Sequence, residues 1–180
     1  MSDTLSPSFY HALTHPRGAY SLVLGTVLGS SLWHSFIGGP VAYKSIPRVQ
    51  FGHLQAALFP KFFALQSTAS FVLLGLYGKA GRLTKAAWRN DKNLWLLAAM
   101  AVSGVANWAV VGPWTSGVMK RRHRKERLEG KDYNDPSASD DMKALNRKFA
   151  KLHGISSLFN LAFLLAAVAH TAHVGAYGAP

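Results

Sequence analysis

The chain contains no cysteine among its 180 residues. Disulfide bonds, thiolate metal sites and cysteine nucleophiles are therefore excluded. Acidic residues are also scarce, because 8 residues are Asp or Glu while 20 are Lys or Arg. None of the acidic residues lies in the long apolar stretches of the chain, so chemistry by paired carboxylates is excluded there. Apolar residues, in contrast, make up 49% of the sequence.

Charge is missing from long continuous runs. Residues 18–43, 93–119 and 152–180 contain no Asp, Glu, Lys or Arg, and residues 49–78 contain one charge, Lys61. A membrane span needs about 20 predominantly apolar residues, and each run meets that length. The helices of a soluble protein keep a charged face toward water, which these runs lack. The sequence therefore predicts an all-α integral membrane protein folded as a four-helix bundle.

The runs also predict the domain organisation. We expect an N-terminal tail at residues 1–17 and a four-span transmembrane domain at residues 18–176. The predicted spans cover about residues 20–43, 54–77, 94–119 and 154–174, and a basic loop covers residues 120–152. Trp33 and Trp108 lie well inside the first and third spans, so we expect them to pack between helices.

The net charge of +12 does not indicate nucleic-acid binding, because the basic residues lie between the apolar runs. In a membrane protein such residues contact anionic lipid head groups. The residues expected to make these contacts are Lys120, Arg121, Arg122, Arg124, Lys125 and Arg127. The first and third loops, with Lys61, carry 14 basic residues, and the other side carries six. The positive-inside rule then predicts that these two loops are cytosolic and both termini lie on the opposite side.

Each predicted span carries polar side chains spaced to share one helix face. These candidates are Ser30, His34, Gln66, Ser70, Ser103, Asn107, His153, Ser157 and Asn160. If the four faces point inward, they meet in one polar layer. Two interpretations stay open. The polar side chains hydrogen-bond the helices to one another, or they line a cavity that binds a small molecule, an ion or a cofactor.

Haem is the cofactor to weigh, with His34 and His153, or His153 and His170, as axial ligands. No pair has a diagnostic spacing, and His170, like His123 and His173, is expected at the membrane interface. We therefore predict no cofactor and keep haem or metal ligation as an alternative. Ser157 and His153 are one helical turn apart, but no acid orients the histidine as a base. No catalytic site is predicted, and the protein is not expected to be an enzyme.

The sequence also contains a candidate internal repeat. The segment KFFALQSTASFVLL at residues 61–74 and the segment KFAKLHGISSLFNL at residues 148–161 share five residues at one offset of 87. Trp33 and Trp108 are each followed by a Gly-Pro pair, with spacings that differ by two residues. The pattern suggests a tandem duplication of a two-helix hairpin. Chance similarity between apolar segments is the alternative.

Three motifs carry a family resemblance. They are LWHSFIGGPVAYKSIPRVQFGHLQAALFPKFF at residues 32–63, NWAVVGPWTSGVMKRRHRKER at residues 107–127 and ALNRKFAKLHGISSLFNL at residues 144–161. In order and spacing they resemble the transmembrane protein 205-like family, a domain of unknown function found widely in eukaryotes. The family positions that match are Phe59, Pro60, Asn107, Pro113, His153, Gly154, Ser157 and Asn160, for which the resemblance implies structural or binding roles.

The resemblance implies a four-span protein of a eukaryotic endomembrane or the plasma membrane. It implies a non-enzymatic role in membrane trafficking, drug or metal tolerance, or scaffolding. The family is distantly similar to bacterial four-helix copper-resistance proteins, so a small-molecule, haem or metal-binding protein stays the alternative function. The partners expected are the lipid bilayer with its anionic head groups, other membrane proteins, or a second copy of the chain.

Overall fold

The computed structural model describes residues 15–180, so most of the predicted N-terminal tail lies outside the described residues. Every regular element among residues 15–180 is helical. Four continuous helical segments are long and apolar enough to cross a membrane, namely Pro16–Ser45, Arg48–Lys79, Lys92–Glu129 and Asp140–Tyr177. The prediction of an all-α fold with four helices able to span a membrane is confirmed.

The first half of the domain is a helical hairpin. Its elements are α2 (Pro16–Leu32), the π-helix η1 (Trp33–Gly38), α3 (Gly39–Ser45) and α4 (Arg48–Lys79). The helix starts at Pro16 because a proline in the first turn leaves no hydrogen bond unmade. The continuous segment ends at Ser45, because the next residue, Ile46, has an extended backbone, as is favoured for the residue before a proline. Pro47 then serves as the N-cap of α4.

The second half has a short additional helix and then the same order of elements, in two longer continuous segments. Its elements are α5 (Ala87–Asn90), α6 (Lys92–Val105), the π-helix η2 (Ala106–Val111), α7 (Gly112–Glu129) and α8 (Asp140–Tyr177). Side chains cap two of these helices. The Asp91 carboxylate accepts a hydrogen bond from the Asn93 amide at 2.9 Å, and the Ser139 hydroxyl accepts one from the Met142 amide at 3.2 Å. Gly130 ends α7 with φ +62°, a left-handed conformation that glycine adopts without strain.

The helices extend beyond the predicted spans. Most of the predicted basic loop at residues 120–152 is helical, since residues 120–129 continue α7 and residues 140–152 open α8. Its Lys, Arg and Glu residues are good helix formers, so loss of apolar character does not end a helix here. The start of the second span also differs, because α4 begins at Arg48 and Pro60 therefore lies inside the helix.

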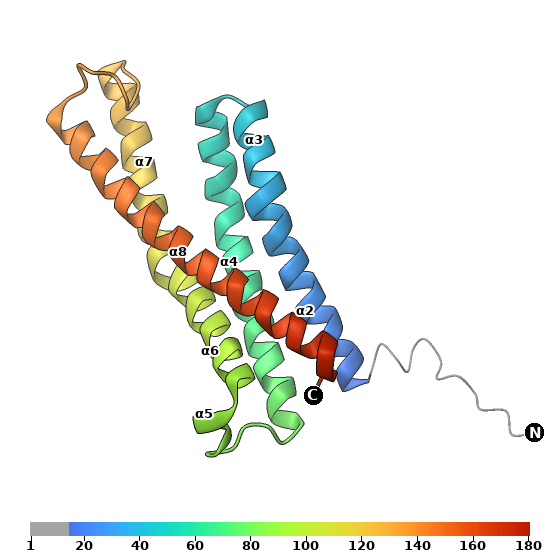
Figure 1. The fold of residues 1–180 in the computed structure, drawn as a ribbon. Coiled ribbons are helices and arrows are strands. Elements are labelled where there is room, and N and C mark those ends of the chain that lie inside the picture. Colours follow the sequence, from blue (N-terminus) through green and yellow to red (C-terminus); the bar gives the residue numbers. More distant parts are fainter. Residues whose placement is uncertain (1–14) are drawn as a thin grey trace, which may run out of the picture.

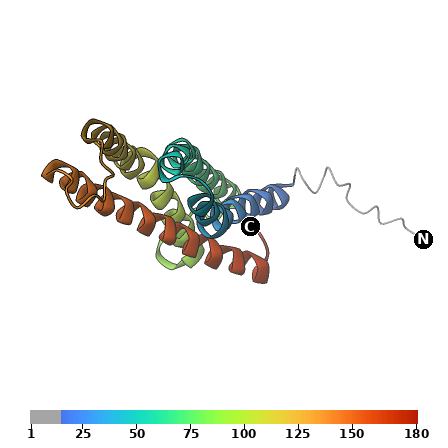
Figure 2. The same cartoon turned by 90° about the horizontal axis from the view of Figure 1, so that it is seen from above.

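Figure 1 shows that α8 crosses the other helices obliquely. Its carboxyl end lies beside the start of α2, and its amino end lies beside α7, an arrangement also visible from above in Figure 2. The buried core between α2, α4, α6 and α8 is apolar. Its fully buried members include Tyr20, Leu24, Val27, Leu73, Leu94, Leu97, Met100, Phe163 and Ala167. This core holds the four segments together at the end of the bundle where α2 begins and α8 ends.

The first and third spans each contain one wide turn. The Gly39 amide donates to the His34 carbonyl, and the Gly112 amide donates to the Asn107 carbonyl, so both bonds reach back five residues instead of four. A proline follows each glycine, and its missing N–H would leave an ordinary helical turn without one bond. Wide turns of this kind occur as single insertions inside α-helices. Their matching positions support the repeat hypothesis, which stays a prediction.

Two tryptophans lie elsewhere than expected. Trp33 and Trp108 are 62% and 50% exposed, so the prediction that they pack between helices was wrong. Trp108 follows directly after the fully buried Asn107. Adjacent helical residues point about 100° apart, so an inward Asn107 turns Trp108 outward. In a membrane this large aromatic surface faces lipid, where its apolar area is well accommodated.

Candidate functional site

The central polar layer is a chain of amide and hydroxyl groups that joins three of the four spans. The Gln66 Nε2 atom on α4 donates to the Ser31 Oγ atom on α2 at 3.2 Å and to the Asn160 Oδ1 atom on α8 at 3.0 Å. The Asn160 Nδ2 atom donates in turn to the Ser35 Oγ atom of η1 at 3.1 Å. Gln66 is fully buried, so its two donated bonds replace water that it cannot reach.

The third span, Lys92–Glu129, contributes to the polar layer through Asn107. This residue lies in η2 and is fully buried. Its Nδ2 atom donates to the backbone carbonyl of Ser156 on α8 at 3.0 Å. All four spans therefore contribute to one hydrogen-bonded level, and Gln66, Asn107 and Asn160 are the three predicted residues that cross from one helix to another.

Two of the four serines of the predicted set bond within their own helices. The Ser30 hydroxyl donates to the Val27 carbonyl at 3.1 Å, and the Ser70 hydroxyl donates to the Gln66 carbonyl at 2.8 Å. Such local bonds satisfy the hydroxyl without linking helices. Ser103 on α6 is also buried. These serines therefore act mainly as small side chains that allow helices to approach.

The helices α4 and α6 approach each other closely at Gly104. A Cβ atom placed there would lie 3.1 Å from the backbone nitrogen of Ser67 and 3.1 Å from its hydroxyl. Backbone yields less readily than a flexible side chain, so a larger residue here would push the two helices apart by a few tenths of an ångström. Small residues at helix contacts are typical of packing in membranes, where close van der Waals contact drives association.

His153 and Ser157 do not join the layer. Both are exposed, and His153 stacks on Phe149 of its own helix with ring centroids 5.6 Å apart. His34 is half-buried against Phe59 and Phe62 on α4, so the two histidines have different surroundings. The cause is the oblique course of α8, which contacts α2 but, within residues 15–180, not α3. At His153 the face of α8 that is turned toward the first span therefore has no helix of residues 15–180 packed against it.

Two oxygens of the layer have no hydrogen-bond partner among residues 15–180, namely Gln66 Oε1 and Asn107 Oδ1. An unsatisfied buried acceptor costs about 1 to 3 kcal/mol, so each oxygen favours a donor such as water or a small ligand. Within the same residues, no three His, Asp or Glu side chains lie close enough to hold a metal ion. What the layer can do chemically is accept hydrogen bonds through neutral oxygens.

A second polar level lies at the end of the bundle where α2 begins and α8 ends. The Tyr20 hydroxyl on α2 and the His170 Nε2 atom on α8 are 2.5 Å apart, and His170 Nδ1 is 3.3 Å from Asn93 Oδ1 on α6. Because an amide oxygen only accepts, Nδ1 carries the proton and Nε2 accepts from the tyrosine. His170 was expected at the membrane interface, but it is 1% exposed.

Sequence reasoning missed this level. Tyr20 and His170 are 150 residues apart in the sequence, and no local pattern pairs them. One signal was available, because an even number of crossings brings the start of the first span and the end of the last span to the same side. Two hydrogen-bonding groups at those ends are candidates for contact on that ground.

The second level continues to α4 through Asp91. The Tyr77 hydroxyl donates to the Asp91 carboxylate, which also accepts from the Asn93 amide. Burial alone would raise the pKa of Asp91, but the bonds from Tyr77 and from the amides of Asn93 and Leu94, together with the charge of Arg82, lower the pKa below its ordinary value. The carboxylate is therefore ionised at neutral pH.

The basic hairpin of α7 and α8 divides the predicted head-group residues into two kinds. Arg122 is buried, with its guanidinium 4.5 Å from the Tyr133 ring centroid and 4.3 Å from that of Phe149. Arg48 covers the Tyr133 ring at 4.0 Å and forms an ion pair with Glu126 at 2.7 Å. Arg122 therefore stacks inside the hairpin and has little surface for lipid.

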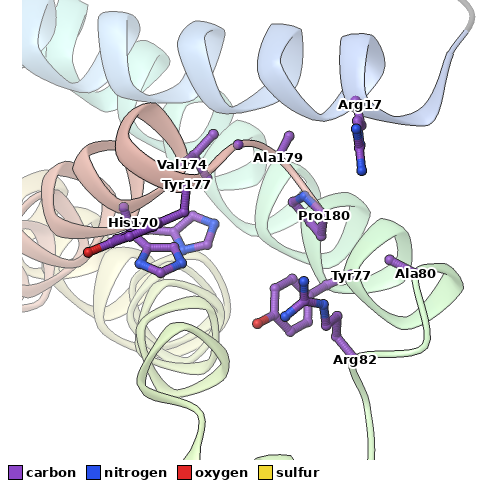
Figure 3. A pocket seen from close by; sticks show the side chains of 11 residues that line it. Arg17, Tyr77, Ala80, Arg82, His170, Val174, Tyr177, Ala179 and Pro180 are labelled. Carbon is purple, nitrogen blue, oxygen red and sulfur yellow. The ribbon is translucent and has the colours of Figure 1, made fainter.

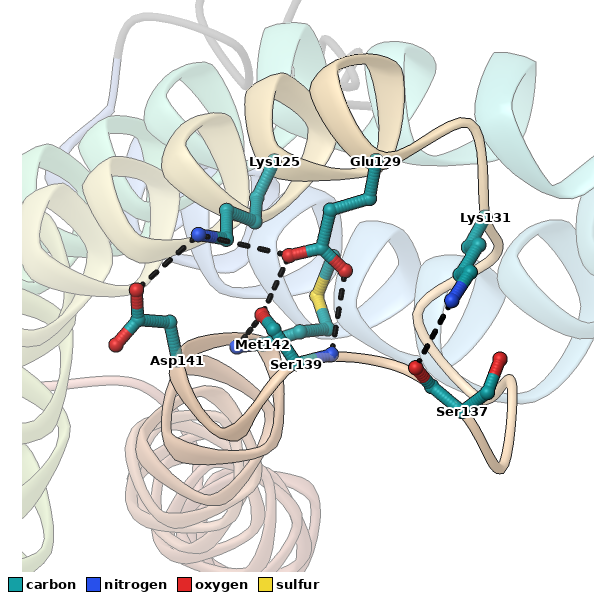
Figure 4. A network of polar contacts seen from close by, with 7 residues as sticks. All are labelled: Lys125, Glu129, Lys131, Ser137, Ser139, Asp141 and Met142. Carbon is teal, nitrogen blue, oxygen red and sulfur yellow. Dashed lines mark hydrogen bonds and ion pairs between the residues drawn. The ribbon is translucent and has the colours of Figure 1, made fainter.

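Lys125 is also used within the hairpin. Its Nζ atom lies 3.5 Å from Glu129 and 3.1 Å from Asp141, so it connects the end of α7 with the start of α8 (Figure 4). Glu129 accepts hydrogen bonds from the Ser139 hydroxyl and amide. These contacts fix the turn of the hairpin and thereby the spacing of the basic residues beside it.

Other basic residues of the hairpin stay open to solvent. Arg121, Arg124 and Lys148 have no acidic partner within ion-pair distance among the described residues. They line a groove of about 460 Å³ between α7 and α8. The groove is lined by Arg121, Arg124, Lys125, Leu128, Asp141, Ala144, Leu145 and Lys148. It therefore combines cationic walls with an apolar strip.

Four apolar spans joined by two polar levels define a multi-pass integral membrane protein. The family can be stated more closely. A family model described as "Domain of unknown function (DUF4149)" matches residues 22–124, which is more than half of the chain, and the protein belongs to this family. No solved structure matches the chain. The matched part ends in α7, so Asn160 and His170 lie outside it.

Proposed function

We propose that this protein is a non-enzymatic multi-pass membrane protein that holds anionic lipid head groups at the α7–α8 hairpin. Its role would be scaffolding, trafficking or tolerance of the kind that the resemblance to the transmembrane protein 205-like family implies. The observation that carries the proposal is the groove in which Arg121, Arg124 and Lys148 are free of acidic partners.

The chemistry of the groove suits a phospholipid. Its guanidinium and ammonium groups attract phosphate, while Leu128 and Leu145 offer apolar contact to the first part of an acyl chain. The groove follows the apolar part of α7 and precedes that of α8, where basic residues of membrane proteins commonly contact head groups. Each basic residue near a membrane surface contributes about 1 kcal/mol of attraction to anionic lipid.

The polar layer supports the non-enzymatic part of the proposal. The donors of Gln66, Asn107 and Asn160 all point to groups on neighbouring helices. Side chains used in this way hold helices together, and such bonds are worth about 0.6 kcal/mol each in membrane proteins, with a maximum near 1.7 kcal/mol. The layer thus serves packing in the first place.

The test compares thermal unfolding of the full chain in phosphatidylcholine nanodiscs with and without phosphatidylserine. We expect phosphatidylserine to raise the midpoint, and we expect the triple variant Arg121→Gln, Arg124→Gln and Lys148→Gln to lose that rise. A matched control changes three basic residues at the other end of the bundle, Lys79→Gln, Lys85→Gln and Arg89→Gln. An equal loss in the control would show that net charge, and not the groove, is responsible.

A second function is favoured by one observation, the unpartnered oxygens of Gln66 and Asn107. They would accept hydrogen bonds from a small molecule bound in the layer. An absorption spectrum and a metal analysis of the purified protein test this alternative, including its haem form. A stoichiometric chromophore or metal that is lost in His34→Ala or His153→Ala would replace the scaffold function with a binding function.

A further inference from the structure

A cavity of about 470 Å³ lies at the end of the bundle opposite to the hairpin groove. It is bounded by the start of α2, the end of α4 and the last turns of α8 (Figure 3). Its lining comprises Arg17, Tyr77, Ala80, Arg82, His170, His173, Val174, Tyr177, Gly178, Ala179 and Pro180. The volume falls in the range of small-molecule sites, which span about 300 to 1,000 Å³.

Two arginines from different elements line this cavity. Arg17 comes from the first turn of α2, and Arg82 comes from the connection after α4. Both side chains are exposed at its rim, and among residues 15–180 no carboxylate lies within ion-pair distance of either guanidinium. Their donors are therefore available to a ligand.

The inner wall of the cavity is already fixed by hydrogen bonds. Tyr77 and His170 are 4% and 1% exposed, and their polar atoms are bonded to Asp91, Tyr20 and Asn93. These bonds join all four spans, so the wall does not have to rearrange when a ligand enters. Preorganisation of this kind lowers the entropy that binding loses.

Asp91 offsets part of the positive charge of Arg82, yet its oxygens are occupied by Tyr77 and the start of α6. The surroundings are strongly basic, since Lys79 ends α4 and the connection to α6 also contains Lys85 and Arg89. A cleft with basic surroundings raises the local concentration of anions.

We propose that this cavity binds a small anion through a carboxylate or phosphate group held between Arg17 and Arg82. A guanidinium presents donors in a planar fork that matches both groups. The anion is either a free solute or the head group of a lipid, because the cavity lies at the end of the spans, where both are present. The site is separate from the hairpin groove, and its test uses different residues.

The experiment titrates the full chain in phosphatidylcholine nanodiscs with inorganic phosphate and with acetate, by calorimetry. A parallel set of nanodiscs contains phosphatidic acid, whose retention is measured by native mass spectrometry. We expect at least one of these anions to bind saturably. Binding of phosphate or acetate identifies a free solute, and retention of phosphatidic acid alone identifies a lipid head group.

The variants separate the site from general charge. We expect Arg17→Gln and Arg82→Gln each to weaken binding by about tenfold, as for a lost hydrogen bond to a charged group. Arg82→Lys keeps the charge but not the planar pair of donors, so its affinity should lie between those of the wild type and Arg82→Gln. Val174→Trp fills the cavity and leaves both arginines, so it should abolish binding. Arg89→Gln, in the same connection but outside the cavity lining, is the matched control and should change affinity by less than about twofold.

Three results would overturn the proposal. These are no saturable binding of any of the three anions, an equal loss in Arg89→Gln, and wild-type affinity in Val174→Trp. Circular dichroism of each variant shows whether it is folded. If Arg82→Gln is unfolded, the affinity of Arg82→Lys tests the role of Arg82 in its place.

Discussion

The bond between Gln66 and Asn160 offers the sharpest test of the polar layer. We consider the variants Gln66→Leu and Asn160→Leu and the double variant that carries both. Gln66→Leu removes the donor to Asn160 and the donor to Ser31, while the leucine fills a similar volume. Asn160→Leu removes the same shared bond and also the donor to Ser35. The double variant therefore isolates the bond that the two residues share.

The expected magnitudes follow from measured bonds in other membrane proteins. Two lost bonds at about 0.6 kcal/mol each give about 1.2 kcal/mol for each single variant. Gln66→Leu also removes the unpartnered Oε1 atom, which offsets part of its loss. The double variant should be less destabilised than the sum of the single variants, by a coupling energy of about 0.6 to 1.7 kcal/mol.

Reversible unfolding in mixed micelles, followed by circular dichroism, gives the free energy of unfolding of all four proteins. Ser70→Ala is the control, because its hydroxyl bonds only within its own helix, to the Gln66 carbonyl, and we expect a change within about 0.5 kcal/mol. A coupling energy of zero within error would refute the direct bond. A stabilised Asn160→Leu would refute the view that the layer holds the helices together.

Three further changes have expected outcomes. The pKa of Asp91 is lowered in the folded protein, so its contribution to stability is full above about pH 4, the ordinary pKa, and is lost as the pH falls through the lower folded-state pKa. The free energy of unfolding, measured between about pH 6 and pH 2, should therefore fall less steeply with pH in Asp91→Asn than in the wild type. An unchanged slope would contradict this. Gly25→Ala, where nothing lies within 4 Å, should stabilise by up to about 1 kcal/mol in micelle unfolding, whereas Gly104→Ala should destabilise; equal effects would argue against the close helix contact. Arg122→Ala should destabilise the hairpin by about 1 to 2 kcal/mol through two lost ring contacts, measured by thermal unfolding, with the exposed Arg121→Ala as a control that should change little.

The spans were predictable because a bilayer leaves one strong signal, a run of apolar residues without charge. The ends of the helices were not, since Lys120 to Glu129 are good helix formers that also suit a loop by composition. Helical spacing selected Gln66, Asn107 and Asn160, whose side chains bond to neighbouring helices. Helical spacing wrongly placed His153 in the layer, because the exposure of His153 depends on the separation between α8 and α3.

The contact between Tyr20 and His170 shows a different limit. Each residue alone is an ordinary polar group near the end of an apolar run. Their bond depends on the angle at which the last helix crosses the first, which no local pattern encodes. For the same reason, the cavity beside them was not foreseen.

The two wide turns have a consequence for how this chain compares with its relatives. A turn that reaches back five residues holds one residue more than an α-helical turn, while the helix on either side keeps its own phase. Deletion of one residue within Trp33–Gly38 or Ala106–Val111 would restore a regular helix without rotating the buried faces of the flanking segments. Alignments of this family should therefore tolerate a single-residue gap at these two segments, and a gap elsewhere in a span would turn half of that helix away from its neighbours.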